Sequence, residues 1–149
     1  MKQLKSTKGV TLLEIMLVLA IAAMVIVMSI RYYQSATTSS QANAAISQIQ
    51  AITAAADNLA IGAGSYSGIP TGALASTTGI GAILGAANLL SPTNGAISVT
   101  AVTTTTYSMS MTLNPAICES VKAKLAATAK ITASACAAGV LTWTYNNTI

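Results

Sequence analysis

Apolar residues dominate the first part of the chain, after a short polar and basic stretch. From Val10 to Ile30 the chain is apolar over 21 residues, except at Thr11, Glu14 and Ser29. A helix of this length spans about 31 Å at 1.5 Å per residue, which matches the hydrocarbon thickness of a bilayer, about 30 Å. Residues 1–9 include three lysines. The pattern therefore predicts a membrane-spanning helix with its basic leader on the cytoplasmic side.

A helical period continues beyond this apolar run. Apolar residues recur at steps of three and four on one face, polar residues occupy the other face, and no proline occurs before Pro70. We therefore expect one helix of about 50 residues, apolar all round in its first half and amphipathic in its second, ending near Gly62 and Gly64. The apolar positions are Ala42, Ala45, Ile46, Ile49, Ile52, Ala56, Leu59 and Ala60, and the polar ones are Asn43, Ser47, Gln50 and Asp57.

The pattern changes from a helical to an alternating period in the second half of the chain. The Gly-, Ala-, Ser- and Thr-rich stretch 62–98 predicts a loop with a short helix, and its glycines lack the Lys-Ser/Thr of a phosphate loop. Residues 97–113 alternate between apolar and hydroxyl side chains, which predicts two strands or one bent ribbon. A last strand, at the edge, is expected over 140–145. The inward positions of the alternation are Ile97, Val99, Ala101, Tyr107, Met109, Met111 and Leu113.

A second helix is predicted between these strands. Asn114 and Pro115 are typical of an N-cap and a first helical position, and Ile117, Val121 and Leu125 follow at helical spacing. Three lysines in this part of the chain, at Lys122, Lys124 and Lys130, indicate a solvated face rather than an anion site. The order of elements predicts an α+β fold, in which the long helix packs on a small antiparallel sheet.

Composition narrows the possible functions. Hydrophobic residues make up 53% of the 149 residues and charged residues 7%, with no histidine and only three acids. The net charge of +4 falls to +1 once residues 1–9 are left out, because four basic residues then face three acids, so nothing favours nucleic-acid binding. The usual general base is missing, and a metal site would have to come from two cysteines and scattered carboxylates, which is a poor set of ligands. We therefore expect no catalytic site, no cofactor and no metal.

The two cysteines, Cys118 and Cys136, match no zinc or redox motif. In an exported chain a disulfide is favoured over two free thiols. It would close a loop of about 19 residues and stabilise the fold by about 3 kcal/mol in the chain-entropy model.

Three interpretations of the N-terminal segment compete. An ordinary signal peptide could be cut after Ala36, and a plain anchor would keep its leader, whereas cleavage after Gly9 would leave the whole apolar stretch on the mature chain. A carboxylate in an apolar helix is costly. Cleavage after Gly9 would place a new amino group on Val10, one helical turn from Glu14, and so create a positive partner for that acid. Alternatively, Glu14 needs no partner, because its side chain reaches the membrane–water interface near the end of the helix.

The segment Gly9-Val10-Thr11-Leu12-Leu13-Glu14, behind a basic leader and ahead of an apolar helix, resembles the type IV prepilin signature. The resemblance implies cleavage after Gly9 and N-methylation of Val10 by one membrane peptidase. It also implies that Glu14 neutralises the terminal amine of a neighbouring subunit during assembly. Valine at the new terminus, where Phe is common, indicates the type IVb branch.

Further matches lie outside this signature. Tyr32-Tyr33-Gln34-Ser35-Ala36, Ser65-Tyr66-Ser67-Gly68 and the C-terminal cysteine pair are similar to the bundle-forming pilin group of that branch. The resemblance implies a globular head whose antiparallel sheet packs on the helix, with residues 118–136 exposed on the filament. The expected division is a leader (1–9), a transmembrane and filament-core helix (10–30), its amphipathic continuation (31–61) and the head (62–149).

The function expected from this resemblance is that of a major structural subunit of a type IVb pilus. Its partners would be identical copies in a helical filament, the prepilin peptidase and methyltransferase, and the assembly machinery of the inner membrane. The chain would reside in that membrane before assembly and in the extracellular pilus afterwards. The alternatives are a pseudopilin of a secretion system, a minor pilin and, least favoured by composition, an exported soluble enzyme.

Overall fold

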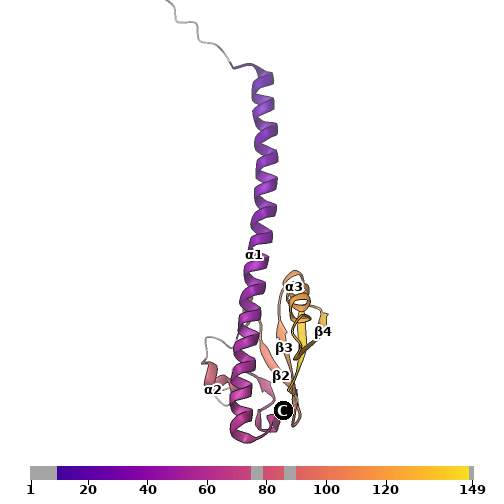
Figure 1. Ribbon diagram of the computed structural model, residues 1–149. Helices are drawn as coiled ribbons and strands as arrows, with labels where there is room; N and C mark the ends of the chain where they lie inside the picture. Colours follow the sequence, from indigo (N-terminus) through magenta and orange to yellow (C-terminus); the bar gives the residue numbers. More distant parts are fainter. Residues whose placement is uncertain (1–9, 75–78, 86–89, 148–149) are drawn as a thin grey trace, which may run out of the picture. The chain divides into compact units, whose positions relative to one another are not determined.

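A computed structural model describes residues 10–74, 79–85 and 90–147 of the chain, without the side chains of residues 133 and 134. The expected long helix is confirmed as α1 (Leu12–Ala63), which has 52 residues and is labelled in Figure 1. The chain divides into two compact units, Met1–Thr37 and Thr38–Ile149, so α1 begins in the first and ends in the second. The helix ends where Gly64 takes a φ of +71°, a left-handed conformation that glycine adopts without steric cost.

The second unit contains a five-stranded antiparallel sheet. Its strands are β1 (Gly72–Ala73), β2 (Ile97–Val102), β3 (Thr106–Thr112), β4 (Ile131–Ala137) and β5 (Val140–Asn146), and their spatial order is β1-β2-β3-β5-β4. The two strands expected within residues 97–113 are therefore confirmed as β2 and β3.

The last strand was expected at the edge, and this was wrong. β5 lies between β3 and β4, and β4 is the edge strand. Most residues of β4 are small, so they carry little of the apolar alternation that marks a strand in sequence. A two-residue turn, Ala138-Gly139, joins β4 to β5 with positive φ at both positions, which is the geometry that matches strand twist in a hairpin.

One position of the predicted alternation was also wrong. Ala101 was assigned to the buried side of the ribbon, but it is exposed. The register between β2 and β3 shifts between Val99 and Ala101. An extra residue in one strand moves every later side chain to the other face, so Ala101 faces outward and Val102 inward.

The buried stripe of α1 in the second unit packs against the inner face of the sheet. All but two of the apolar helical positions expected from the sequence are buried; Ile46 and Leu59 are partly buried against the core, and Ala55 joins it. Figure 1 shows this part of α1 beside β2 and β3. The strands contribute Ile97, Val99, Tyr107, Met109, Met111, Leu141, Trp143 and Tyr145 to the same core. The expected α+β fold, with a pilin-like helix packed on a small antiparallel sheet, is confirmed.

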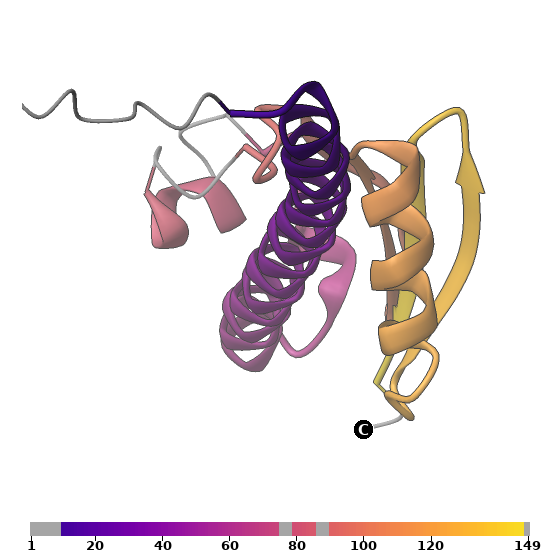
Figure 2. The same ribbon diagram turned by 90° about the horizontal axis from the view of Figure 1, so that it is seen from above.

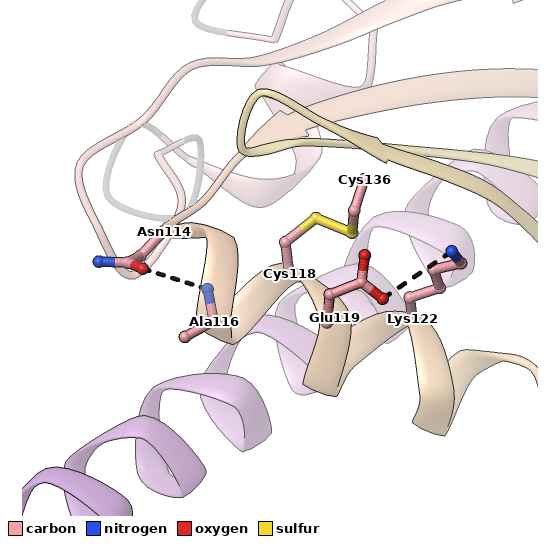
Figure 3. The surroundings of a disulfide bond; sticks show 6 residues. All are labelled: Asn114, Ala116, Cys118, Glu119, Lys122 and Cys136. Atoms are coloured by element: carbon pink, nitrogen blue, oxygen red, sulfur yellow. Dashed lines mark hydrogen bonds and ion pairs between the residues drawn. A yellow bond between two sulfur atoms is a disulfide. The ribbon is translucent and has the colours of Figure 1, made fainter.

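A third helix, α3 (Pro115–Leu125), completes the core. Ile117, Val121 and Leu125 are buried, as their spacing predicted, and Figure 2 shows α3 beside the β4–β5 hairpin. Asn114 is the N-cap: its side-chain oxygen accepts a hydrogen bond from the Ala116 amide at 3.2 Å (Figure 3).

The central region holds more structure than the sequence indicated. The expected short helix is α2 (Ile80–Leu84), and residues 62–98 also contain the 3-10 helix η1 (Tyr66–Gly68) and the strand β1. Three-residue helices and two-residue strands are too short to produce a period in sequence. Residues 75–78 and 86–89 of this region lie outside the described residues.

Candidate assembly helix and head surface

The apolar helix of the first unit is exposed along its length. Its most hydrophobic 18-residue window has a mean hydropathy of 2.7, and no residue of that window is buried. The large apolar side chains from Val10 to Ile30 are between 49% and 79% exposed. A core helix of a soluble protein would bury one face. This segment is long and apolar enough to cross a membrane, and its whole circumference is available to lipid or to other helices.

The start of this helix is set by Thr11. The Glu14 amide donates to the Thr11 carbonyl at 3.0 Å and to its Oγ1 at 3.3 Å, so Thr11 acts as the N-cap and Glu14 is the third helical residue. Thr-x-x-Glu is the sequence of a capping box, a signal that the sequence analysis missed. Placement in the first turn also suits a carboxylate, because the helix dipole is positive there.

The residues expected to take part in processing lie just before this cap. Gly9 lies outside the described residues, and Val10 and Thr11 precede α1. Glu14 and Val10 are exposed. The expected cleavage after Gly9, the methylation of Val10 and the charge pairing of Glu14 therefore stay predictions.

The two cysteines form a disulfide between α3 and β4. Cys118 lies in α3, where it is fully buried, and Cys136 lies in β4 and packs against the core. Their Cα atoms are 6.0 Å apart and 18 positions apart in sequence. Figure 3 shows the bond joining the helix to the hairpin. Because Cys136 is paired with Leu141 of β5, the disulfide holds α3 against the hairpin's inner face.

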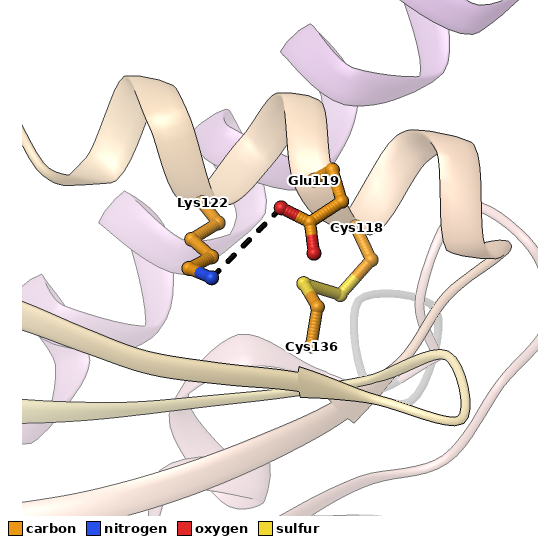
Figure 4. A network of polar contacts seen from close by, with 4 residues as sticks. All are labelled: Cys118, Glu119, Lys122 and Cys136. Carbon is orange, nitrogen blue, oxygen red and sulfur yellow. Dashed lines mark ion pairs between the residues drawn. A yellow bond between two sulfur atoms is a disulfide. The ribbon is translucent and has the colours of Figure 1, made fainter.

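The surface between the cysteines carries most of the head's charges. Lys122 Nζ lies 3.8 Å from Glu119 Oε2, and both side chains are well exposed (Figure 4), so the pair adds little stability. Lys124 donates to Asn43 Oδ1 of α1 at 2.6 Å, and Lys130 donates to Asn147 Oδ1 at 3.1 Å. The expected solvated lysine face is thus exposed, although each lysine has a partner.

A polar network that no sequence pattern predicted lies at the other end of the head. Asp57 was placed on the polar face of the helix, but its carboxylate accepts hydrogen bonds from two tyrosines. Tyr66 donates to Oδ1 at 2.6 Å and Tyr145 donates to Oδ2 at 3.1 Å, while Asn147 Nδ2 donates to the Tyr66 hydroxyl at 3.1 Å. These residues come from α1, η1, β5 and the C-terminal segment, so only the folded chain brings them together.

Three tyrosine rings pack above this carboxylate. Tyr107 lies with its ring centroid 5.2 Å from that of Tyr66 and 5.2 Å from that of Tyr145. Burial, followed by the hydrogen bond to Asp57, raises the pKa of Tyr66 to about 12. Burial, followed by the nearby Asp57 charge, raises the pKa of Tyr145 and of Tyr107. Each hydroxyl therefore stays neutral in the folded head, and those of Tyr66 and Tyr145 serve Asp57 as donors.

Neither this network nor the cysteine surface forms a metal-binding cluster. In the part of the chain that the structure describes, no group of three or more His, Cys, Asp or Glu side chains could hold a metal ion.

The chain is similar to known proteins over part of its length. Over 76 residues it is 42% identical to the major structural subunit of bundle-forming pilus from Escherichia coli O127:H6 (strain E2348/69). It is equally similar to the protein of the same name from Escherichia coli O111:H-. This chain resembles bundle-forming pilin.

The resemblance indicated by the sequence motifs is thereby confirmed. The match with bundle-forming pilin covers 51% of this chain and 39% of each relative, so the chain spans about two fifths of the relatives' length. No protein-family model matches the chain, and no solved structure matches it.

Proposed function

We propose that the chain is a structural subunit of a type IVb pilus, polymerising through its N-terminal helix into a surface filament. The observation that carries the proposal is an apolar helix with no buried residue in its 18-residue core window, in a chain that resembles a major pilus subunit. Such a helix requires a lipid or protein environment. The membrane would supply the lipid environment before assembly, and the helices of neighbouring subunits would supply the protein environment in the filament.

The proposed division of the chain follows from this change of environment. Residues 1–9 are the leader, residues 10–30 span the membrane and then form the filament core, and residues 31–61 continue the helix toward the head at 62–149. The prepilin peptidase would remove the leader after Gly9 and methylate Val10. The assembly machinery of the inner membrane would then transfer the subunit to the extracellular filament.

Glu14 is the proposed assembly residue. A lone carboxylate costs about 2.5–3.5 kcal/mol at the centre of a membrane helix, and this figure is an upper limit for Glu14 in the first turn. The amine of Val10 in an arriving subunit would neutralise it within the filament. A unit charge pair about 4 Å apart contributes about 4 kcal/mol at an effective dielectric constant of about 20, which is enough to offset that cost.

Substitution of Glu14 tests the assembly step. Glu14→Ala and Glu14→Gln should leave the precursor in the membrane in normal amounts but abolish or strongly reduce filaments. Ser29→Ala is the matched control, since the Ser29 hydroxyl donates to the Val25 carbonyl of its own helix, at 2.8 Å. Normal filament yield from both Glu14 variants would refute the charge-pair model.

Mass spectrometry of purified filaments tests the processing step. We expect an N-terminus at Val10 with the added mass of one methyl group, whereas a terminus near Thr37 would indicate an ordinary signal peptide. Major, minor and pseudopilin roles differ in abundance, so the chain should be the main protein of the filament. Adhesion and cell aggregation are the proposed tasks, and loss of both on deletion of the gene is the expected result.

A further inference from the structure

The loop that leads into β2 contains the one Asn-Gly pair of the sequence, Asn94-Gly95. Asn94 is exposed and has a φ of +58°, a left-handed conformation that Asn adopts more readily than most residues with a side chain. Gly95 is required by close packing, because a Cβ at this position would collide with the Thr112 carbonyl oxygen of β3. The local structure therefore favours these two residue types side by side.

An asparagine followed by glycine is prone to deamidation, since the small glycine leaves its own nitrogen open to the preceding side chain. The Gly95 nitrogen loses its proton and attacks Cγ of Asn94. A new N–C bond closes a five-membered succinimide ring, and the former amide nitrogen takes up a proton and leaves as ammonia. Water then opens the ring at either carbonyl and yields aspartate or isoaspartate. The exposed carboxamide of Asn94 is accessible to the water that this reaction consumes.

The main-chain groups of Gly95 are both bound by Ser91. The Gly95 amide donates to Ser91 Oγ at 2.8 Å, and the Gly95 carbonyl accepts from the Ser91 amide at 2.9 Å. Ser91 Oγ itself donates to the Thr112 carbonyl at 2.8 Å, so its hydrogen is directed at β3 and its lone pairs are free to accept from Gly95. Ser91 is only 3% exposed, and the hydroxyl is therefore held in place by its surroundings.

This arrangement opposes ring closure in two ways. The nitrogen becomes a nucleophile only after it loses its proton, and in the folded head that proton is donated to Ser91. The nitrogen must also move toward Cγ of Asn94, which breaks both hydrogen bonds between Gly95 and Ser91. One ordinary hydrogen bond corresponds to a factor of about 3 to 10 in rate.

We propose that Asn94 is a site of spontaneous deamidation and that the buried hydroxyl of Ser91 suppresses the reaction in the folded head. Ser91 is a positioning residue, because it acts on Asn94 through Gly95. Aspartate would add a negative charge to the loop, and isoaspartate would lengthen the main chain by one carbon next to β2. The inference goes beyond the proposed pilus function and does not depend on it.

Comparison of the folded and unfolded parent chain tests the suppression. The whole chain in a non-ionic detergent is kept in mildly alkaline buffer with and without concentrated urea, and peptide mass spectrometry follows conversion at Asn94. Asn58, which precedes a leucine, is the internal reference. We expect conversion at Asn94 to be at least about 10-fold slower in the folded chain, since two hydrogen bonds must break. Equal rates, or no conversion at Asn94 in urea, would overturn the proposal.

Substitution of Ser91 tests the role of its hydroxyl. Ser91→Ala should speed conversion in the folded chain about 3- to 10-fold. Thr93→Ala is the matched control, because the Thr93 hydroxyl donates to the same Thr112 carbonyl, at 3.3 Å, while the Gly95 amide donates to Ser91. This control should stay within a factor of about 2 of the parent. No acceleration in Ser91→Ala, or equal acceleration in Thr93→Ala, would contradict the role of Ser91.

Two further measurements separate local protection from loss of the fold. Asn114→Ala weakens the distant N-cap of α3, so equal acceleration in this variant would show that conversion follows global unfolding and would overturn the proposal. Emission of the buried Trp143 confirms that each variant is folded. Amide hydrogen exchange of Gly95 in the parent needs no variant: we expect slow exchange, and exchange at the rate of an unprotected amide would overturn the proposal.

Discussion

Asp57 links the helix to the rest of the head, and its removal should destabilise the head strongly. Asp57→Ala takes the acceptor from two tyrosine hydroxyls, at 2.6 Å and 3.1 Å. An unsatisfied buried donor costs about 1–3 kcal/mol, and bonds to a charged group lie toward the upper end. Tyr66 is fully buried and Tyr145 is 6% exposed, but Asp57 itself is only half-buried, so water recovers part of the loss. We expect about 2–4 kcal/mol for Asp57→Ala.

The loss of stability should depend on which residue replaces Asp57. Asp57→Asn keeps one oxygen acceptor and turns an amino group toward the other tyrosine, whose hydroxyl can then accept instead of donate. We therefore expect about 1–2 kcal/mol for Asp57→Asn, less than for alanine. The neighbouring Asn58, which is exposed on the same helix, is the matched control, and Asn58→Ala should stay within about 0.5 kcal/mol of the parent.

Urea unfolding of the whole chain in a non-ionic detergent measures these differences. Trp143, the single tryptophan, is fully buried in the head core, so its emission reports unfolding of the head rather than of the apolar helix. A double-mutant cycle of Asp57→Ala with Tyr66→Phe should give a coupling of about 1 kcal/mol or more. Additive effects, or a loss below about 0.5 kcal/mol for Asp57→Ala, would refute the assigned network.

Further predictions concern the disulfide, the buried hydroxyls and the helix cap. Replacing Cys118 and Cys136 together by alanine should cost about 3 kcal/mol, since the loop spans 18 positions; chemical denaturation of the variant measures it, and an unchanged midpoint would contradict it. The Tyr66 pKa is raised from 10 to about 12, so the folded head favours the neutral hydroxyl. The stabilisation that this hydroxyl gives the fold should be complete below pH 10 and should be lost as the pH rises toward 12. Unfolding followed by Trp emission at each pH measures it, and a free energy of unfolding that stays constant over this range would contradict it. The Tyr107 hydroxyl is buried and has no hydrogen-bond partner among the residues that the structure describes, so Tyr107→Phe should be neutral or stabilising, and a loss above about 1 kcal/mol would indicate a bonded hydroxyl. Asn114→Ala should cost about 1 kcal/mol through loss of the N-cap, whereas Asn114→Asp should cost far less in the same unfolding assay.

Much of the architecture could be predicted because it rests on local signals. A continuous helix from residue 12 to residue 63 follows from unbroken apolar and then amphipathic periodicity without an intervening proline. Asn114-Pro115 determines the start of α3 through cap geometry within four residues. The register between Gly9 and Glu14 is also a local pattern, and it led to the resemblance to the type IV prepilin signature.

Other features depend on contacts between distant parts of the chain. β4 consists largely of small residues, so its place at the sheet edge is decided by pairing with β5 and by the disulfide to α3. Ala101 faces outward because the pairing of β2 with β3 shifts by one residue before it. The alternation of apolar and polar residues within β2 does not show this shift.

The sequence by itself determined the exposed apolar helix, the acid in its first turn and the strands that face a common core. Tertiary structure alone decided the role of Asp57, because its two tyrosine partners lie 9 and 88 positions away. It also decided the outer face of the sheet, since alternation within each strand predicts a polar side but not which strands lie beside it. Only the pairing order β2-β3-β5-β4 joins those polar sides into one surface.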